Sequence, residues 1–136
     1  MEFITDRTEA DVLMGTAKGI YQDADLNRVE AAVAEISAQF HSLGICLELV
    51  VKTDWLPPED YSSENWVTDD QMTRYLENVS AIRGLFPVSV ELPQSMSDLN
   101  WEGANNIEKI LKAAVERISA IRQTYRYSGE FYAGEE

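Results

Sequence analysis

The chain has 136 residues, which is near the commonest size for one domain and enough to bury a single hydrophobic core. Twenty-four acidic against eleven basic side chains give a formal net charge of −13, so nucleic acids and anionic membranes would repel its surface. No apolar run approaches the roughly 20 residues that span a bilayer, and we expect one domain over residues 1–136 without membrane insertion.

The first predicted helix follows Thr8, because Thr8 and Asp11 have the spacing of a capping box. In that arrangement two side chains satisfy free donors of the helix start. We expect Val12 and Leu13 of this short helix to pack against the other helices.

A long helix is predicted from Asp25 to Leu43, because apolar side chains recur there every three or four residues. Asp23 or Asp25 can cap its start, and Gly44 can end it in the left-handed conformation. The positions that form the apolar stripe are Leu26, Val29, Val33, Ile36, Phe40 and Leu43.

Two more helices are predicted, from Thr68 to Arg83 and from Asn100 to Tyr125, each with an apolar stripe of helical period. Between the helices, residues 47–52 and 88–92 are rich in β-branched side chains, so each is a short strand or an extended segment. The fold class is therefore mainly α: a three- to four-helix bundle with a short extended or β element.

Aromatic side chains gather in the predicted loop from Asp54 to Val67, which contains Trp55, Tyr61 and Trp66. Trp101 lies at the start of the last helix. Such rings either anchor a loop on the core or form a stacking platform for a carbohydrate or peptide, and anchoring is favoured. These four residues are the candidate ligand or partner surface.

Catalytic and metal-binding patterns are not found. His41 is the only histidine and is expected on the surface near a helix end, while Cys46 sits in an apolar run and is expected to be buried. Asp23 and Asp25 resemble the start of a calcium loop, but the rest of that pattern is missing. We expect neither an enzyme nor a cofactor.

Two long helices begin alike. Residues 27–30 and 105–108 both read Asn-x-[Val/Ile]-Glu. A duplication would explain this, but two helices that face one core would share the pattern anyway, so both explanations stay open. An asparagine in the first turn, such as Asn27 or Asn105, is expected to bind nearby backbone groups.

Several motifs of the chain resemble, in the same order, an uncharacterised family of prophage proteins from Gram-positive gut bacteria, encoded among tail-region and virion-structural genes. The resemblance covers nearly the whole chain, including a closing motif around Tyr127–Glu130 that is expected to form a tight turn. The segments that carry it are residues 16–30, 52–55, 75–79, 104–111 and 127–135.

The family motifs at the helix starts contain Asp25, Asn27, Arg28, Asn105 and Glu108, which have adequate structural roles. Arg28 either contributes to the helix start or pairs with a carboxylate of another helix, such as Glu108. The resemblance implies no catalytic or ligand residue.

The setting that the resemblance implies is a phage particle. The expected function is a structural or adaptor module of the virion, tail-associated and acting through protein partners. It would reside in the bacterial cytoplasm during assembly and then in the virion. Self-association stays open, and the alternative is a module that binds host-surface carbohydrate through the aromatic loop.

Overall fold

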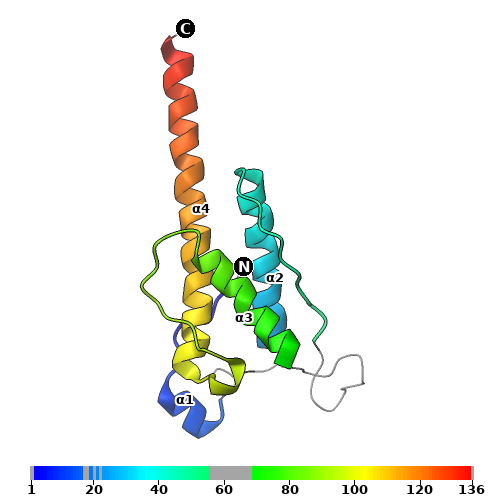
Figure 1. Cartoon of the computed structure of the whole chain (residues 1–136). Helices are drawn as coiled ribbons and strands as arrows, with labels where there is room; N and C mark the ends of the chain where they lie inside the picture. Colours follow the sequence, from blue (N-terminus) through cyan, green and yellow to red (C-terminus); the bar gives the residue numbers. More distant parts are fainter. Residues whose placement is uncertain (1, 17–18, 20, 22, 56–68, 136) are drawn as a thin grey trace.

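The structure is a computed structural model that describes residues 2–16, 19, 21, 23–55 and 69–135. Its elements are α1 (Glu9–Met14), α2 (Asp23–Ser42), α3 (Asp69–Arg83), the short 3-10 helix η3 (Met96–Asp98) and α4 (Trp101–Glu135). Helices α2 and α4 run side by side in the same direction, and α3 crosses them (Figure 1). The expectation of a mainly α fold is confirmed.

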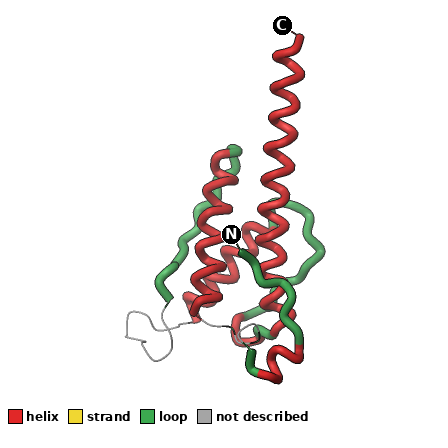
Figure 2. Tube along the Cα trace, turned by 180° about the vertical axis from the view of Figure 1, so that it is seen from behind, coloured by secondary structure: helices red, strands yellow, loops and turns green. Residues whose placement is uncertain are grey.

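The residues described include no strand (Figure 2). Residues 47–52 and 88–92 are extended segments that connect the helices. Of the two alternatives left open by their β-branched composition, the structure therefore has the extended one. Their apolar side chains, apart from the exposed Val50, pack partly buried against the core.

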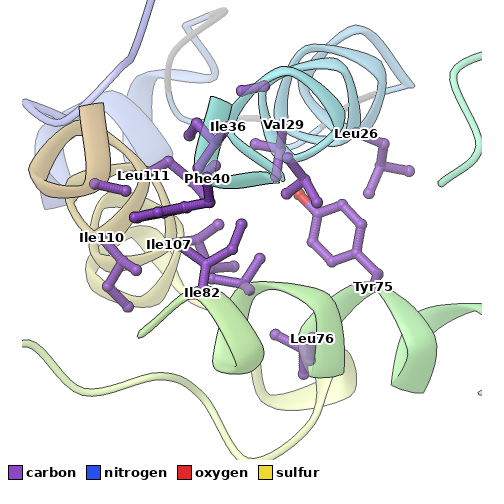
Figure 3. Packing of buried hydrophobic residues seen from close by; sticks show 14 of the residues in the cluster. Leu26, Val29, Ile36, Phe40, Tyr75, Leu76, Ile82, Ile107, Ile110 and Leu111 are labelled. Carbon is purple, nitrogen blue, oxygen red and sulfur yellow. The ribbon is translucent and has the colours of Figure 1, made fainter. Parts of the chain in front are cut away.

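The core lies between α2, α3 and α4, where the three apolar stripes meet (Figure 3). Burying one large aliphatic or aromatic side chain stabilises a fold by about 1.5–3 kcal/mol, so these stripes determine how the helices pack. The buried residues that the core takes from α2 and α4 include Val29, Val33, Ile36, Phe40, Ile107, Leu111, Ala114 and Ile118.

Helix α1 has the predicted capping box. The Thr8 hydroxyl accepts from the Asp11 amide at 3.2 Å, and the Asp11 carboxylate accepts from the Thr8 amide at 3.0 Å. The expectation that Val12 and Leu13 dock on the bundle is wrong, since they are 45% and 79% exposed. A helix of six residues without a buried side chain is held through its caps instead.

Helix α4 is longer than expected. Its start is capped by the Asn100 side chain, which accepts from the Gly103 amide at 2.8 Å. The backbone stays helical as far as Glu135, so the prediction of a turn at residues 127–130 is wrong. A glycine inside a helix costs about 1 kcal/mol without breaking it, and α4 projects beyond α2 (Figure 1).

Within the described residues, no helix combines the length and the apolarity that crossing a bilayer requires.

Candidate functional site

The long helices α2 and α4 carry the same pair of polar residues, at the same position counted from the helix start. Asn27 and Glu30 form what we call the α2 acceptor, and Asn105 and Glu108 form the α4 acceptor. The two glutamates are only 1% and 0% exposed. A carboxylate is rarely buried so completely without partners, and both find them in an extended segment from another part of the chain.

The α4 acceptor holds residues 4–7, which run beside α4 (Figure 2). The Asn105 side chain accepts from the Arg7 amide at 3.0 Å and donates to the Arg7 carbonyl at 2.9 Å. Glu108 Oε1 accepts from the Ile4 amide at 3.1 Å. One side-chain amide thus satisfies both backbone groups of Arg7, a role that a neighbouring strand would fill in a sheet.

Charged side chains complete the α4 acceptor. Arg7 donates to Glu108 Oε2 at 2.7 Å, and Arg28 donates to both oxygens of Glu108 at 2.9 Å. Asp25 accepts from Arg28 at 2.7 Å and from Arg7 at 3.4 Å. Of the two roles left open for Arg28, the structure shows the pairing with Glu108. Asp25, one of the two residues expected as a cap, lies within the helix and binds both arginines.

The cluster balances two carboxylates with two guanidinium groups, so it is neutral as a whole. Burial disfavours the charge of Arg28, but hydrogen bonds to Glu108 and Asp25 outweigh it and raise the pKa of Arg28 above its usual value. The arginine therefore stays charged, and both carboxylates keep a cationic partner.

The α2 acceptor holds residues 52–55 through the same contacts. Asn27 accepts from the Trp55 amide at 2.8 Å and donates to the Trp55 carbonyl at 2.9 Å. Glu30 Oε1 accepts from the Lys52 amide at 3.2 Å, and Glu30 Oε2 accepts from the indole N–H of Trp55. Asn27 and Asn105 therefore bind backbone far along the chain rather than the nearby groups that were expected.

The cation of the α2 acceptor comes from α3. Arg74 donates to Glu30 Oε1 and to the Val50 carbonyl, each at 2.6 Å. Asn78 also donates to the Val50 carbonyl, at 2.7 Å. The α3 helix thereby fixes the approach of the extended segment to α2.

Two tyrosine hydroxyls meet near the α4 acceptor, those of the partly buried Tyr21 and the buried Tyr75. The Arg7 guanidinium lies 5.6 Å from the centroid of the Tyr21 ring. Burial, the main cause, raises the pKa of both phenols above the ordinary value. The two hydroxyls therefore stay protonated in mildly alkaline solution.

This protonated pair predicts a tyrosine titration. Because the folded-state pKa values of Tyr21 and Tyr75 are raised, their stabilising effect is complete below pH ~10 and is lost as the pH rises through those folded values. Phenolate absorbance below pH ~11 should therefore keep the same amplitude in Tyr21→Phe and Tyr75→Phe variants. An amplitude that falls by one tyrosine in either variant would contradict the burial.

Removing Arg28 tests the charge balance of the α4 acceptor. Arg28→Ala removes one of the two guanidinium groups that bind Glu108 and Asp25, and we expect a loss of about 1–3 kcal/mol in the free energy of unfolding. The guanidinium is partly exposed, which limits the loss. Thermal and urea unfolding measure it, with Arg117→Ala, which removes an exposed guanidinium of α4, as the matched control. An unchanged midpoint in Arg28→Ala would count against the pairing.

The candidate aromatic surface is only partly described. Trp55 is 2% exposed, so it anchors the chain and cannot stack against a ligand in this structure. Trp101 is half-buried and lines a cavity of about 330 Å³ beside Arg7 and Asn100. Tyr61 and Trp66 lie outside the described residues.

Cys46 is exposed, which corrects the expectation that it is buried. It follows the turn that ends α2, and its Sγ lies 3.1 Å from Nδ1 of His41, which is exposed as expected. In the part of the chain that the structure describes, no three His, Cys, Asp or Glu side chains are placed to hold a metal ion.

An open groove of about 960 Å³ lies between α3 and the segment around η3. Its lining is largely apolar and includes Met72 and Met96, and Glu77 supplies a carboxylate. Neither acceptor glutamate lines it. The groove therefore offers a contact surface rather than an acid–base pair.

Sequence reasoning missed Arg7, Glu30 and Arg74, because isolated charged residues give no sign that they are buried together. One signal was available. Thr-Asp occurs at residues 5–6 and again at 53–54, directly before the two residues, Arg7 and Trp55, that the asparagines hold.

Comparisons of this chain with protein-family models, with curated proteins and with solved structures found no match.

Proposed function

We propose that this chain is a non-enzymatic structural or adaptor module that acts through protein–protein contacts in a phage or prophage virion, associated with the tail. The observation that carries the proposal is that buried charged side chains bind other parts of the same chain. Arg7, Asp25, Glu30 and Glu108 bind segments of the same chain. Catalysis would instead require titratable groups that face a substrate.

The surface supports contacts with proteins. Helix α1 exposes three apolar side chains in a row, Val12, Leu13 and Met14, although it buries none. The groove beside α3 adds Met72 and Met96. Exposed apolar patches and methionine-rich grooves are typical of surfaces that bind other proteins.

The virion setting is supported by the family resemblance alone, and particles test it directly. Phage particles induced from a host that carries this gene would be purified and analysed by mass spectrometry. The proposal predicts peptides of this chain at a fixed ratio to tail proteins. Particles with a full set of tail proteins and without this chain would overturn the setting.

A surface variant tests the contacts. Leu13→Asp combined with Met14→Asp should reduce incorporation into particles while leaving the fold intact, because both side chains are exposed. Ala10→Asp is the matched control, since it adds charge to α1 without removing a large apolar group. Equal incorporation of the double variant, Ala10→Asp and the unchanged protein would exclude α1 as the contact.

A further inference from the structure

The acceptors and the segments they hold occur along the chain in one order, twice. Each repeat begins with a Thr-Asp segment, at residues 5–6 and 53–54. A threonine with the sequence spacing of a capping box follows in each repeat, Thr8 with Asp11 and Thr68 with Gln71, although Thr68 lies outside the described residues. The Asn-x-[Val/Ile]-Glu motif comes next, at 27–30 and 105–108. Each repeat is therefore an extended segment, a shorter helix and a long helix.

The long helices also correspond along their buried faces. The sequence separation between Asn27 and Asn105 is also the separation between matching buried residues of α2 and α4. This match extends over more than three helical turns. Two helices that only share a core would match in their apolar positions. They would not need to match in their buried polar positions as well. The corresponding buried pairs are Val29 with Ile107, Val33 with Leu111, Ile36 with Ala114, and Phe40 with Ile118.

The hydrogen bonds correspond atom by atom. In each repeat the asparagine Oδ1 and Nδ2 bind the amide and carbonyl of one residue, Arg7 or Trp55. The glutamate Oε1 accepts from the amide three positions earlier. Its Oε2 accepts from the side chain of the same residue, a guanidinium in one case and an indole N–H in the other.

The segments are crossed between the repeats. Residues 4–7 precede α2 but dock on α4, whereas residues 52–55 precede α4 but dock on α2. Reciprocal exchange of one element between two equivalent units is the geometry of a segment-swapped dimer. The repeated order together with the exchange is not explained by a shared core alone.

We infer that residues 2–43 and 50–121 are two copies of one folding unit that have exchanged their extended segments, and that the α4 acceptor also binds this Thr-Asp segment from a second copy of the chain. The inference rests on the proposed protein-binding function and names its partner. The ligand class is an extended tetrapeptide whose fourth residue carries an N–H donor for the buried glutamate.

Two features make this site able to accept a segment in trans. The α4 acceptor bonds to the backbone of Ile4 and Arg7 and to the side chain of Arg7. The same segment supplied by another copy of the chain could make the same bonds. Helix α1, which follows the segment, buries no residue and does not fix it to its own chain.

Peptide binding to an emptied site tests the recognition. A variant without residues 2–7 would be titrated calorimetrically with a peptide of residues 2–8 and with one of residues 50–56. Both should bind, the second more weakly because an indole replaces the guanidinium beside Asp25. N-methylation of the Arg7 amide should weaken the first peptide about tenfold or more. Failure of either unmodified peptide to bind the folded variant would overturn the inference.

Full-length chains test the exchange even if the shortened variant does not fold. Arg7→Ala and Asn105→Ala chains of different mass would be refolded together at high concentration and examined by native mass spectrometry. Only a mixed pair joins an intact segment to an intact α4 acceptor, so the heterodimer should exceed the two homodimers combined, which random pairing would only equal. The chain with both substitutions is the control.

Monomers alone in every mixture would overturn the exchange. Neither experiment uses phage particles. Absence of the chain from virions would therefore reject the proposed setting without affecting the results on segment exchange. Conversely, incorporation into virions by chains that never exchange segments would reject the inference and keep the proposed function.

Discussion

Glu108→Ala is expected to lower the free energy of unfolding by about 3–5 kcal/mol, the range for removing one partner of a buried ion pair. The carboxylate accepts from Arg7, Arg28 and the Ile4 amide. Without it, the buried Arg7 guanidinium loses its 2.7 Å carboxylate contact, while that with Asp25 is longer, at 3.4 Å. Urea unfolding followed by far-ultraviolet circular dichroism measures the loss.

The controls separate charge from helix content. Lys109→Ala changes the neighbouring exposed residue of α4 and should shift stability by less than about 0.5 kcal/mol. Glu108→Gln keeps the shape and one acceptor oxygen while removing the charge. Its free energy of unfolding should lie between those of Glu108→Ala and Lys109→Ala. Equal stability of Glu108→Ala and Lys109→Ala would show that the cluster does not hold the segment.

Trp55→Ala is expected to cost about 3–5 kcal/mol, as for other large side chains removed from a core. The ring is almost fully buried, and its indole N–H is the donor to Glu30 Oε2. Trp55→Phe retains most of the packing and loses that donor, so it should cost less, about 1–3 kcal/mol. Both are measured by urea unfolding.

The difference between the two variants is informative. A smaller loss in Trp55→Phe indicates that packing and the hydrogen bond both contribute. If both variants are as stable as the unchanged protein, Trp55 does not anchor the segment to α2. The exposed Thr53 supplies the control, since Thr53→Ala removes a side chain without a described contact to the acceptor.

The helices could be predicted because their determinants are local. Apolar stripes of helical period gave the positions of α2, α3 and α4 to within a few residues at their starts, and the pair Thr8 and Asp11 gave the start of α1. The pairing of Arg28 with Glu108 was one of the two roles that the sequence left open for Arg28.

The rest depends on contacts between distant positions. Anchoring of Trp55 was the favoured expectation, but composition and periodicity do not reveal the burial of Arg7 or the backbone bonds to Asn105 and Asn27. Cys46 was expected inside because its neighbours are apolar, but the segment that follows α2 is extended and turns that side chain outward. Apolar neighbours alone therefore misplaced it.

Hydrogen exchange of individual amides tests most directly whether each Asn-x-x-Glu pair holds one extended segment. In Asn105→Ala, the amides of Ile4 and Arg7 should lose protection about tenfold or more, while those of Lys52 and Trp55 keep it. Asn27→Ala should give the reverse pattern. If both variants lose protection in both segments alike, or in neither, the two acceptors are not separate sites and the account is wrong.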